Sequence, residues 1–270
     1  MGRMRKREVM ITGSSNPKIK QIVQWQNKAK ERRSAGIFLV EGFKMFEEAP
    51  EGWIRESYLS EDAWEKVCSV PGLKDKLVRT GFETVSREVF RKMSDTQTPQ
   101  GILCVLERPG YGLEELLAVP KPLFIVLENL QDPGNLGTIV RTGEGAGVTG
   151  IIMGAGTADI YNPKTIRATM GSVFRVPFVY AENLGDVIER LRESGVTIYA
   201  AHLAGKKYYD SFPFQEGTAF LIGNEGMGLS RELAARADSW LKIPMEGHVE
   251  SLNAAVTASI LMYEVHRQRR

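Results

Sequence analysis

Three segments of the chain combine glycine, asparagine and serine with charged side chains, and each one follows an apolar run. They occupy residues 128–142, 221–230 and 243–260. Glycine-rich turns let the backbone approach a ligand closely and supply amides that can cradle it. The polar side chains in the same segments would then be free to orient or act on a polar substrate.

The first segment contains a turn followed by a predicted helix. Residues 132–134 read Asp-Pro-Gly, and Asn135 is a natural N-cap. Arg141 follows six residues later, about 600° round the helix, on the side away from Ile139. A single arginine is more often a surface cation, but the turn beneath this one favours a functional role.

In the second segment, Gly223, Gly226 and Gly228 surround Glu225 after an apolar strand. A flexible turn between a strand and a helix is the alternative. We favour a ligand site because a carboxylate in such a turn can either anchor amides or face a polar substrate.

The third segment predicts a helix that Ser251 caps, with Asn253 in its first turn and free to point at a ligand. One face carries small or apolar residues that suit close packing, as in a buried helix or a dimer interface: Leu252, Ala255, Val256, Ser259 and Ile260.

The elements that must position these residues form two domains. Prolines and glycines at 109–120 predict a linker between a smaller α/β domain at 1–108 and a second domain at 121–270. In the second domain, short apolar runs alternate with helical periodicity, which predicts a mostly parallel sheet covered on both faces. The expected strands are 123–127, 150–153, 176–180, 196–200, 218–222 and 240–243, and the expected helices 136–146, 163–171, 184–194, 230–237 and 252–267. Ligands bind such sheets beyond the carboxyl ends of the strands.

Composition indicates a soluble globular protein, with 43% hydrophobic and 25% charged residues among 270. Two cysteines cannot form a disulfide framework or a cysteine-rich zinc site. No apolar run is long enough for a signal peptide or a membrane span, so we expect a cytoplasmic protein without membrane contact.

Charge is distributed unevenly. Residues 1–33 hold ten basic and two acidic groups, although the whole chain is only +2. A basic helix at 17–35 could contact phosphates, with Trp25 available for stacking on bases, or it could be a solvated end of the chain. The basic residues at 266–270 could equally complement the dipole of a helix C-terminus.

Several common sites are excluded. Residues 145–150 read G-x-G-x-x-G, but a helix ends and a strand begins there, which is the wrong context for a dinucleotide site. The chain has no P-loop and no G-x-S-x-G motif. His202, His248 and His266 lack the spacing of zinc ligands, so we expect no metal.

Taken in order, the three segments resemble the motifs of the SpoU (TrmH-like) family of SPOUT RNA methyltransferases. The motifs read N-x-x-D-P-x-N-x-G-x-x-x-R from Asn129, G-N-E-G-x-G from Gly223, and I-P-M followed by S-L-N. The first half is similar to that family's L30e-like RNA-binding domain through residues 15–20, 36–42 and 99–102.

The resemblance implies a SPOUT domain with a deep trefoil knot, a homodimer, S-adenosylmethionine as cofactor and methylation of a ribose 2′-hydroxyl in RNA. Ribosomal RNA, in particular 23S, is the first expected substrate. A transfer RNA methyltransferase and a noncatalytic RNA-binding or ribosome-assembly protein are the alternatives. A nucleotide-dependent enzyme acting on a small metabolite is a further one.

By motif position, the resemblance implies that Gly223, Ile243 and Leu252 contact the cofactor through the main chain, and that Leu203 and Met245 belong to the same cofactor site. It implies a catalytic and substrate-orienting set of Asn135, Arg141, Glu225, Ser251 and Asn253. The family's base is often placed at Arg141, but a guanidinium titrates above about 12. We therefore expect Arg141 to hold a phosphate and the ribose oxygen and to stabilise developing negative charge. Gly143, Gly145 and Ala254 depart from the family's usual residues.

Overall fold

The computed structural model describes residues 10–270, and its contacts divide the chain into two compact units, each described here by itself. Unit 1 comprises Met1–Pro109 and Tyr161–Phe174, and unit 2 comprises Gly110–Ile160 and Arg175–Arg270. The expected second domain at 121–270 is therefore interrupted, because residues 161–174 belong to unit 1. Four of the basic residues noted above, Arg3, Arg5, Lys6 and Arg7, lie outside the described residues.

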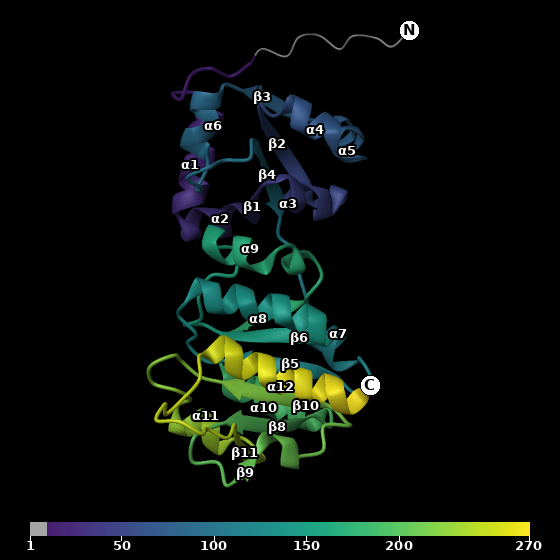
Figure 1. The fold of residues 1–270 in the computed structure, drawn as a ribbon, viewed down its shortest axis with the longest axis vertical. Coiled ribbons are helices and arrows are strands. Elements are labelled where there is room, and N and C mark those ends of the chain that lie inside the picture. The colour runs from purple at the N-terminus through teal and green to yellow at the C-terminus, as the bar shows by residue number, and fades with distance from the viewer. Residues whose placement is uncertain (1–9) are drawn as a thin grey trace. The chain divides into compact units, whose positions relative to one another are not determined.

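Unit 1 is built on a four-stranded sheet in the order β1-β4-β2-β3 (Figure 1). β4 (Ile102–Glu107) pairs antiparallel with β1 (Ile37–Glu41) and β2 (Ile54–Ser60), and β3 (Glu83–Val85) runs parallel to β2. The helices of this unit are α1 (Pro17–Asn27), α2 (Ala29–Ala35), α3 (Phe43–Glu48), α4 (Trp64–Ser69), α5 (Leu73–Thr80), α6 (Arg87–Met93) and α9 (Pro163–Thr169). The periodicity of the sequence did not predict α4, α5, β3 or α6.

The single basic helix expected at 17–35 is wrong. The chain breaks at Lys28, whose backbone is extended, and Arg32 folds back so that its guanidinium donates to the carbonyls of Trp25 at 2.6 Å and Gln26 at 3.1 Å. Trp25 and Arg32 are both buried. Trp25 packs in the core with Ile19 and is not available for stacking on a base.

Aromatic packing explains why residues 161–174 join unit 1. The ring of Phe38 on β1 lies 4.7 Å from that of Tyr161 and 6.3 Å from that of Phe174. Trp53 contacts Phe174 as well. A deletion of the first 110 residues would remove Phe38 and Trp53, so the rings of Tyr161 and Phe174 would lose these packing partners.

Unit 2 has a seven-stranded, entirely parallel sheet in the order β7-β6-β5-β10-β8-β11-β9, which confirms the predicted mostly parallel architecture. The strands are β5 (Leu123–Leu127), β6 (Gly150–Gly154), β7 (Phe178–Ala181), β8 (Thr197–Ala201), β9 (Lys207–Tyr208), β10 (Thr218–Ile222) and β11 (Ser239–Lys242). The sequence predicted all of these except the short edge strand β9.

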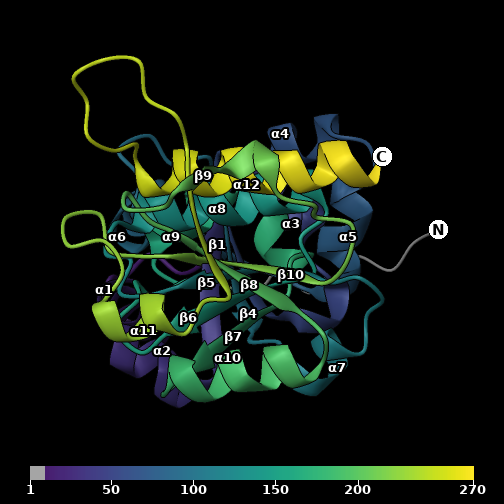
Figure 2. The same ribbon diagram turned by 90° about the horizontal axis from the view of Figure 1, so that it is seen from below.

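Helices cover both faces of this sheet. α8 (Pro133–Ala146) and α12 (Ala254–Arg269) pack together on one face, while α7 (Leu113–Leu117), α10 (Leu184–Glu193) and α11 (Arg231–Ala235) lie on the other (Figure 2). α7 lies within the expected linker at 109–120, and its Leu116 is buried in the core. No helix of the described part of the chain is long and apolar enough to span a bilayer.

One of the basic residues at the end of the chain, Arg269, holds α12 to the rest of the unit. Arg269 donates to the carbonyls of Phe214 at 2.8 Å and Lys121 at 2.6 Å, and also to Glu216 and Thr218. This guanidinium ties the last turn of α12 to the loop that precedes β10.

We predict that Arg269→Ala lowers the free energy of unfolding by about 2 kcal/mol, because several half-buried carbonyls lose a charged donor. Urea denaturation followed by circular dichroism measures it. Arg270→Ala removes the neighbouring exposed arginine and should change nothing. Equal midpoints for the two variants would contradict this role.

Candidate active site

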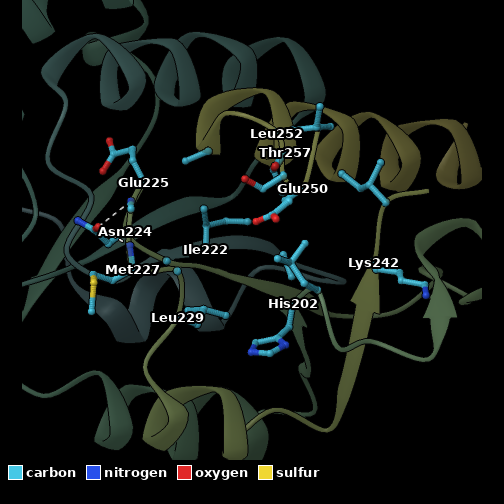
Figure 3. A pocket seen from close by; sticks show the side chains of 18 of the residues that line it. His202, Ile222, Asn224, Glu225, Met227, Leu229, Lys242, Glu250, Leu252 and Thr257 are labelled. Atoms are coloured by element: carbon cyan, nitrogen blue, oxygen red, sulfur yellow. Dashed lines mark hydrogen bonds between the residues drawn. The ribbon is translucent and has the colours of Figure 1, made fainter. Parts of the chain in front are cut away.

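A pocket of about 290 Å³ lies at the carboxyl ends of β8, β10 and β11 (Figure 3). It is lined by residues that follow these strands and by the start of α12: Ala201, His202, Leu203, Ile222, Gly223, Asn224, Glu225, Gly226, Met227, Gly228, Leu229, Leu241, Lys242, Ile243, Met245, Glu250, Ser251, Leu252, Ala254 and Thr257. The position is where open parallel sheets bind ligands. The five expected cofactor residues, Gly223, Ile243, Leu252, Leu203 and Met245, all line this one pocket.

The loop after β10 is rigid and tightly folded. A Cβ added to Gly223 would lie only 2.1 Å from the carbonyl carbon of Gly228, so a larger residue does not fit. Asn224 and Gly228 exchange backbone hydrogen bonds of 3.0 and 2.9 Å. The Asn224 side chain also accepts from the amides of Gly226 and Met227 (Figure 3). The glycines therefore build a closely packed, hydrogen-bonded turn between β10 and α11, whose N-cap is Ser230.

Glu225 anchors this loop to the loop that follows β5. Its carboxylate accepts hydrogen bonds of 3.0 Å from the backbone amides of Gln131 and Asp132 and from the side-chain amide of Asn135. Burial raises the pKa of Glu225, but these three donors lower it by more, so the net pKa lies below the usual value. Of the two roles expected for this carboxylate, the structure has it anchoring amides.

Asn135 connects Glu225 to α12. Its side-chain oxygen accepts a 3.0 Å hydrogen bond from the Asn253 amide. Asn135 is not the N-cap of α8 as expected, because Asp132 caps that helix by accepting from the Asn135 backbone amide at 2.8 Å. Proline at the first helical position, here Pro133, favours the earlier start.

The cap of α12 also differs from the expectation. Asn253, and not Ser251, caps the helix by accepting from the amides of Ala255 and Val256. Both ends of the Asn253 amide are thus engaged within the protein, and the expected free side chain is wrong. Ser251 remains on the pocket wall.

Arg141 lies apart from the pocket. It is exposed on α8, opposite the buried Ile139, as the helical spacing predicted. It does not line the pocket, and within residues 10–270 no hydrogen bond or ion pair holds its guanidinium. The structure therefore gathers nine of the ten expected site residues in or beside one pocket and leaves Arg141 outside.

The expected set omitted several polar residues that line the pocket, among them His202, Asn224, Glu250 and Thr257. His202 could have been found, because it directly follows a predicted strand. Glu250 lies between the two parts of the third motif, and Thr257 follows its S-L-N part. Figure 3 shows Glu225 turned away from both. Asn224 gave no signal of its role, because its bonds depend on the turn it builds.

Comparisons with known proteins agree across the chain. Residues 122–263 match the SpoU rRNA Methylase family, and residues 16–104 match the MRM3-like substrate binding domain. The chain is 35% identical to the 23S rRNA (guanosine(2553)-2′-O)-methyltransferase RlmP of Bacillus subtilis, over 94% of this chain and 98% of that protein. It is 31% identical to the 23S rRNA (uridine(2479)-2′-O)-methyltransferase of Streptomyces viridochromogenes, over 91% and 89%.

A solved structure shares the fold of both units. The AdoMet-bound rRNA methyltransferase from Sinorhizobium meliloti superposes with a TM-score of 0.85 and 32% identity, covering 96% of this chain and 97% of that one.

We predict that Glu225→Gln loosens the two loops and lowers the free energy of unfolding by about 1–2 kcal/mol at pH 7, because a neutral amide cannot accept from all three donors. The folded-state pKa of Glu225 is depressed, so its contribution is present above the unfolded value near 4.3 and is lost as pH falls through the folded value.

Urea denaturation at several values from about pH 3 to about pH 7, a range that includes the titration of a glutamate, measures this effect. The gap between the wild type and Glu225→Gln should close at the acid end. Glu246→Gln, in an exposed loop, is the matched control. A gap that stays constant with pH would exclude the anchoring role.

Proposed function

The chain belongs to the SpoU rRNA methylase family, and from this premise we propose that it methylates a ribose 2′-hydroxyl of 23S ribosomal RNA with S-adenosylmethionine as the methyl donor. The observation that carries the proposal is the pocket at the carboxyl edge of the parallel sheet, in a chain that matches 23S rRNA 2′-O-methyltransferases over nearly its whole length. A transfer RNA substrate is not favoured. We place the reaction in the cytoplasm.

The pocket residues fit S-adenosylmethionine. Leu203, Ile243 and Leu252 provide apolar walls for a planar adenine ring, and the fixed turn at 223–228 presents main-chain groups to it. The carboxylate of Glu250 suits a cationic ligand. The ammonium of Lys242 lies 5.4 Å from the centroid of the Tyr208 ring and makes a cation–π interaction with it. Met245 and Ser251 complete the cofactor side of the proposed site.

Bound S-adenosylmethionine supplies an electrophilic methyl group, so no metal is required. The protein must orient the ribose hydroxyl and stabilise the oxygen as it loses its proton. Arg141 is the proposed stabiliser, because a guanidinium without an internal partner can bind a phosphate and the ribose oxygen together. Glu225, Asn135 and Asn253 are proposed to act as positioning residues that hold the loops around the substrate.

We propose a homodimer in which Arg141 acts on the partner's pocket. Val256 and Tyr263 on α12 are 47% and 50% exposed, and with Ile260 they form an apolar stripe at helical spacing. Val256 and Ile260 belong to the face expected to pack in a buried helix or a dimer interface, and the exposure of Val256 favours the dimer interface. A Cβ added to Gly145 on α8 would lie 3.0 Å from the Tyr263 hydroxyl, and Arg141 lies one turn before Gly145. The arginine and the stripe thus share one surface.

The implied trefoil knot stays a prediction.

We predict that Arg141→Ala lowers the turnover of ribose methylation by about 10²–10³, because a donor to developing negative charge is lost. Transfer of labelled methyl groups to 23S rRNA measures the turnover, and titration calorimetry should show unchanged S-adenosylmethionine binding. Arg190→Ala, which removes an exposed arginine of α10, is the control. Near wild-type turnover of Arg141→Ala would refute the assignment, and a wild type that binds RNA but no S-adenosylmethionine would favour the noncatalytic alternative.

A second prediction tests the shared site. Leu252→Trp fills the pocket, and Arg141→Ala removes the guanidinium, so each homodimer should be inactive. A heterodimer of the two variants, purified through two different affinity tags, keeps one intact pocket facing one intact Arg141 from the other subunit. We expect it to recover about half of the wild-type activity, because one of two equivalent sites is restored. A heterodimer as inactive as its parents would place Arg141 and the pocket of one chain in the same site.

A further inference from the structure

Unit 1 contains a polar pocket that the methyl-transfer chemistry does not use. Leu59 of β2 lies opposite Ile102 of β4 in antiparallel pairing, so the end of β2 and the start of β4 meet at one edge of the sheet. Ser60 of β2 lies opposite Val85 of β3 in parallel pairing, which brings the start of α6 to the same edge. The segments that leave this edge enclose a pocket of about 220 Å³.

The walls of this pocket are fixed by close backbone contacts. The backbone amide of Ser60 donates a 2.8 Å hydrogen bond to the carbonyl of Gly101. Gly101 has φ +95°, and an added Cβ would lie 2.6 Å from the Cβ of Ala63, so only glycine fits there. The neighbouring Gln100 accepts a 3.0 Å hydrogen bond from the Phe43 amide. The pocket is therefore formed before any ligand binds.

Three cations line it, Lys66 from α4 and Arg87 and Arg91 from α6. The pocket's carboxylate, Asp62, accepts from the Ser60 hydroxyl and lies 3.5 Å from the Arg87 guanidinium. The hydrogen bond from Ser60 is the main reason that the pKa of Asp62 is lowered, so this carboxylate is charged and holds Arg87 in place. Lys66 and Arg91 are exposed, and within the described residues their side chains make no hydrogen bond or ion pair.

The basic helices α1 and α2 are less suited to hold RNA than their composition suggested. Lys18 pairs with Glu83, and Arg32 is buried against main-chain carbonyls. The remaining cations at 20, 28, 30 and 33 are exposed on the two helices and the break between them, and they do not line the pocket.

We propose that the pocket lined by Lys66, Arg87 and Arg91 binds the phosphate backbone of the substrate RNA. This inference rests on the RNA methyltransferase function proposed above. Arginine forks bind phosphate oxygens in pairs and lysine adds a point charge, while hydroxyl and amide groups such as those of Thr98 and Gln97 can meet ribose hydroxyls. The pocket is smaller than the roughly 300 Å³ at which enclosed ligand sites begin, and it suits one phosphate-ribose unit of a longer strand.

The test is the triple variant Lys66→Gln, Arg87→Gln, Arg91→Gln in the full chain, with protein-free 23S rRNA as the probe. We expect the RNA affinity to fall about tenfold or more. The slope of log K against log salt should become shallower by about 2, because each of the three lost phosphate contacts contributes about 0.7. Lys74→Gln, an exposed lysine of the same unit outside this pocket, should keep the wild-type affinity and slope. S-adenosylmethionine binding should be unchanged in both. Wild-type affinity and slope in the triple variant would overturn the proposal.

Chemical acetylation of the wild type decides the matter without substitutions. Bound 23S rRNA should protect Lys66 and leave Lys74 reactive. Equal labelling of Lys66 with and without RNA would overturn the proposal, and so would full protection by adenosine monophosphate alone, which would assign the pocket to a free nucleotide. Methyl transfer by the wild type is measured separately, so failure of the proposed reaction and failure of this binding site give different results.

Discussion

The carboxylate of Glu225 makes more hydrogen bonds between the loops of the candidate site than any other side chain there. Parallel strands β5 and β10 are neighbours, and past their ends the Glu128 amide still donates to the Ile222 carbonyl and the Asn224 side chain donates to the Asn129 carbonyl. Glu225 adds three hydrogen bonds between the loops, which its carboxylate accepts from the backbone amides of Gln131 and Asp132 and from the Asn135 side chain. Asn135 in turn accepts a hydrogen bond from Asn253, the cap of α12. Charged acceptors make stronger hydrogen bonds than neutral ones, so a single exposed side chain can fix three segments that are far apart in the sequence.

This arrangement separates two tasks that the sequence motifs place side by side. Gly223 and the apolar residues after β8 and β11 shape the pocket, whereas Asn135 and Asn253 satisfy each other and Glu225. Arg141 belongs to neither group and remains on the outer surface of α8 beside an apolar stripe of α12. A pocket that is complete in itself, with its candidate electrostatic group on a separate surface, is what a site shared between two copies requires.

Unit 2 was largely predictable, because each buried strand is a short apolar run and each helix has an apolar face, as at 123–127 and 218–222. Unit 1 was less so, since α4, α5 and α6 are shorter than the window over which helical periodicity is visible. Motif order identified the pocket residues, but local chemistry misplaced both caps. Asp132, followed by Pro133, caps α8 in place of Asn135. Asn253 caps α12 in place of Ser251. The return of 161–174 to unit 1 could not be read from the sequence, because it depends on contacts between residues that are far apart in the chain.

The return of Tyr161–Phe174 has a consequence for biosynthesis. Phe38 finds two of its aromatic neighbours only in this segment, so the amino-terminal unit lacks part of its interior until more than half of the polypeptide has left the ribosome. Domains usually fold in the order of translation. Here the early unit must wait, partly assembled, for a piece that is translated between strands of the later one.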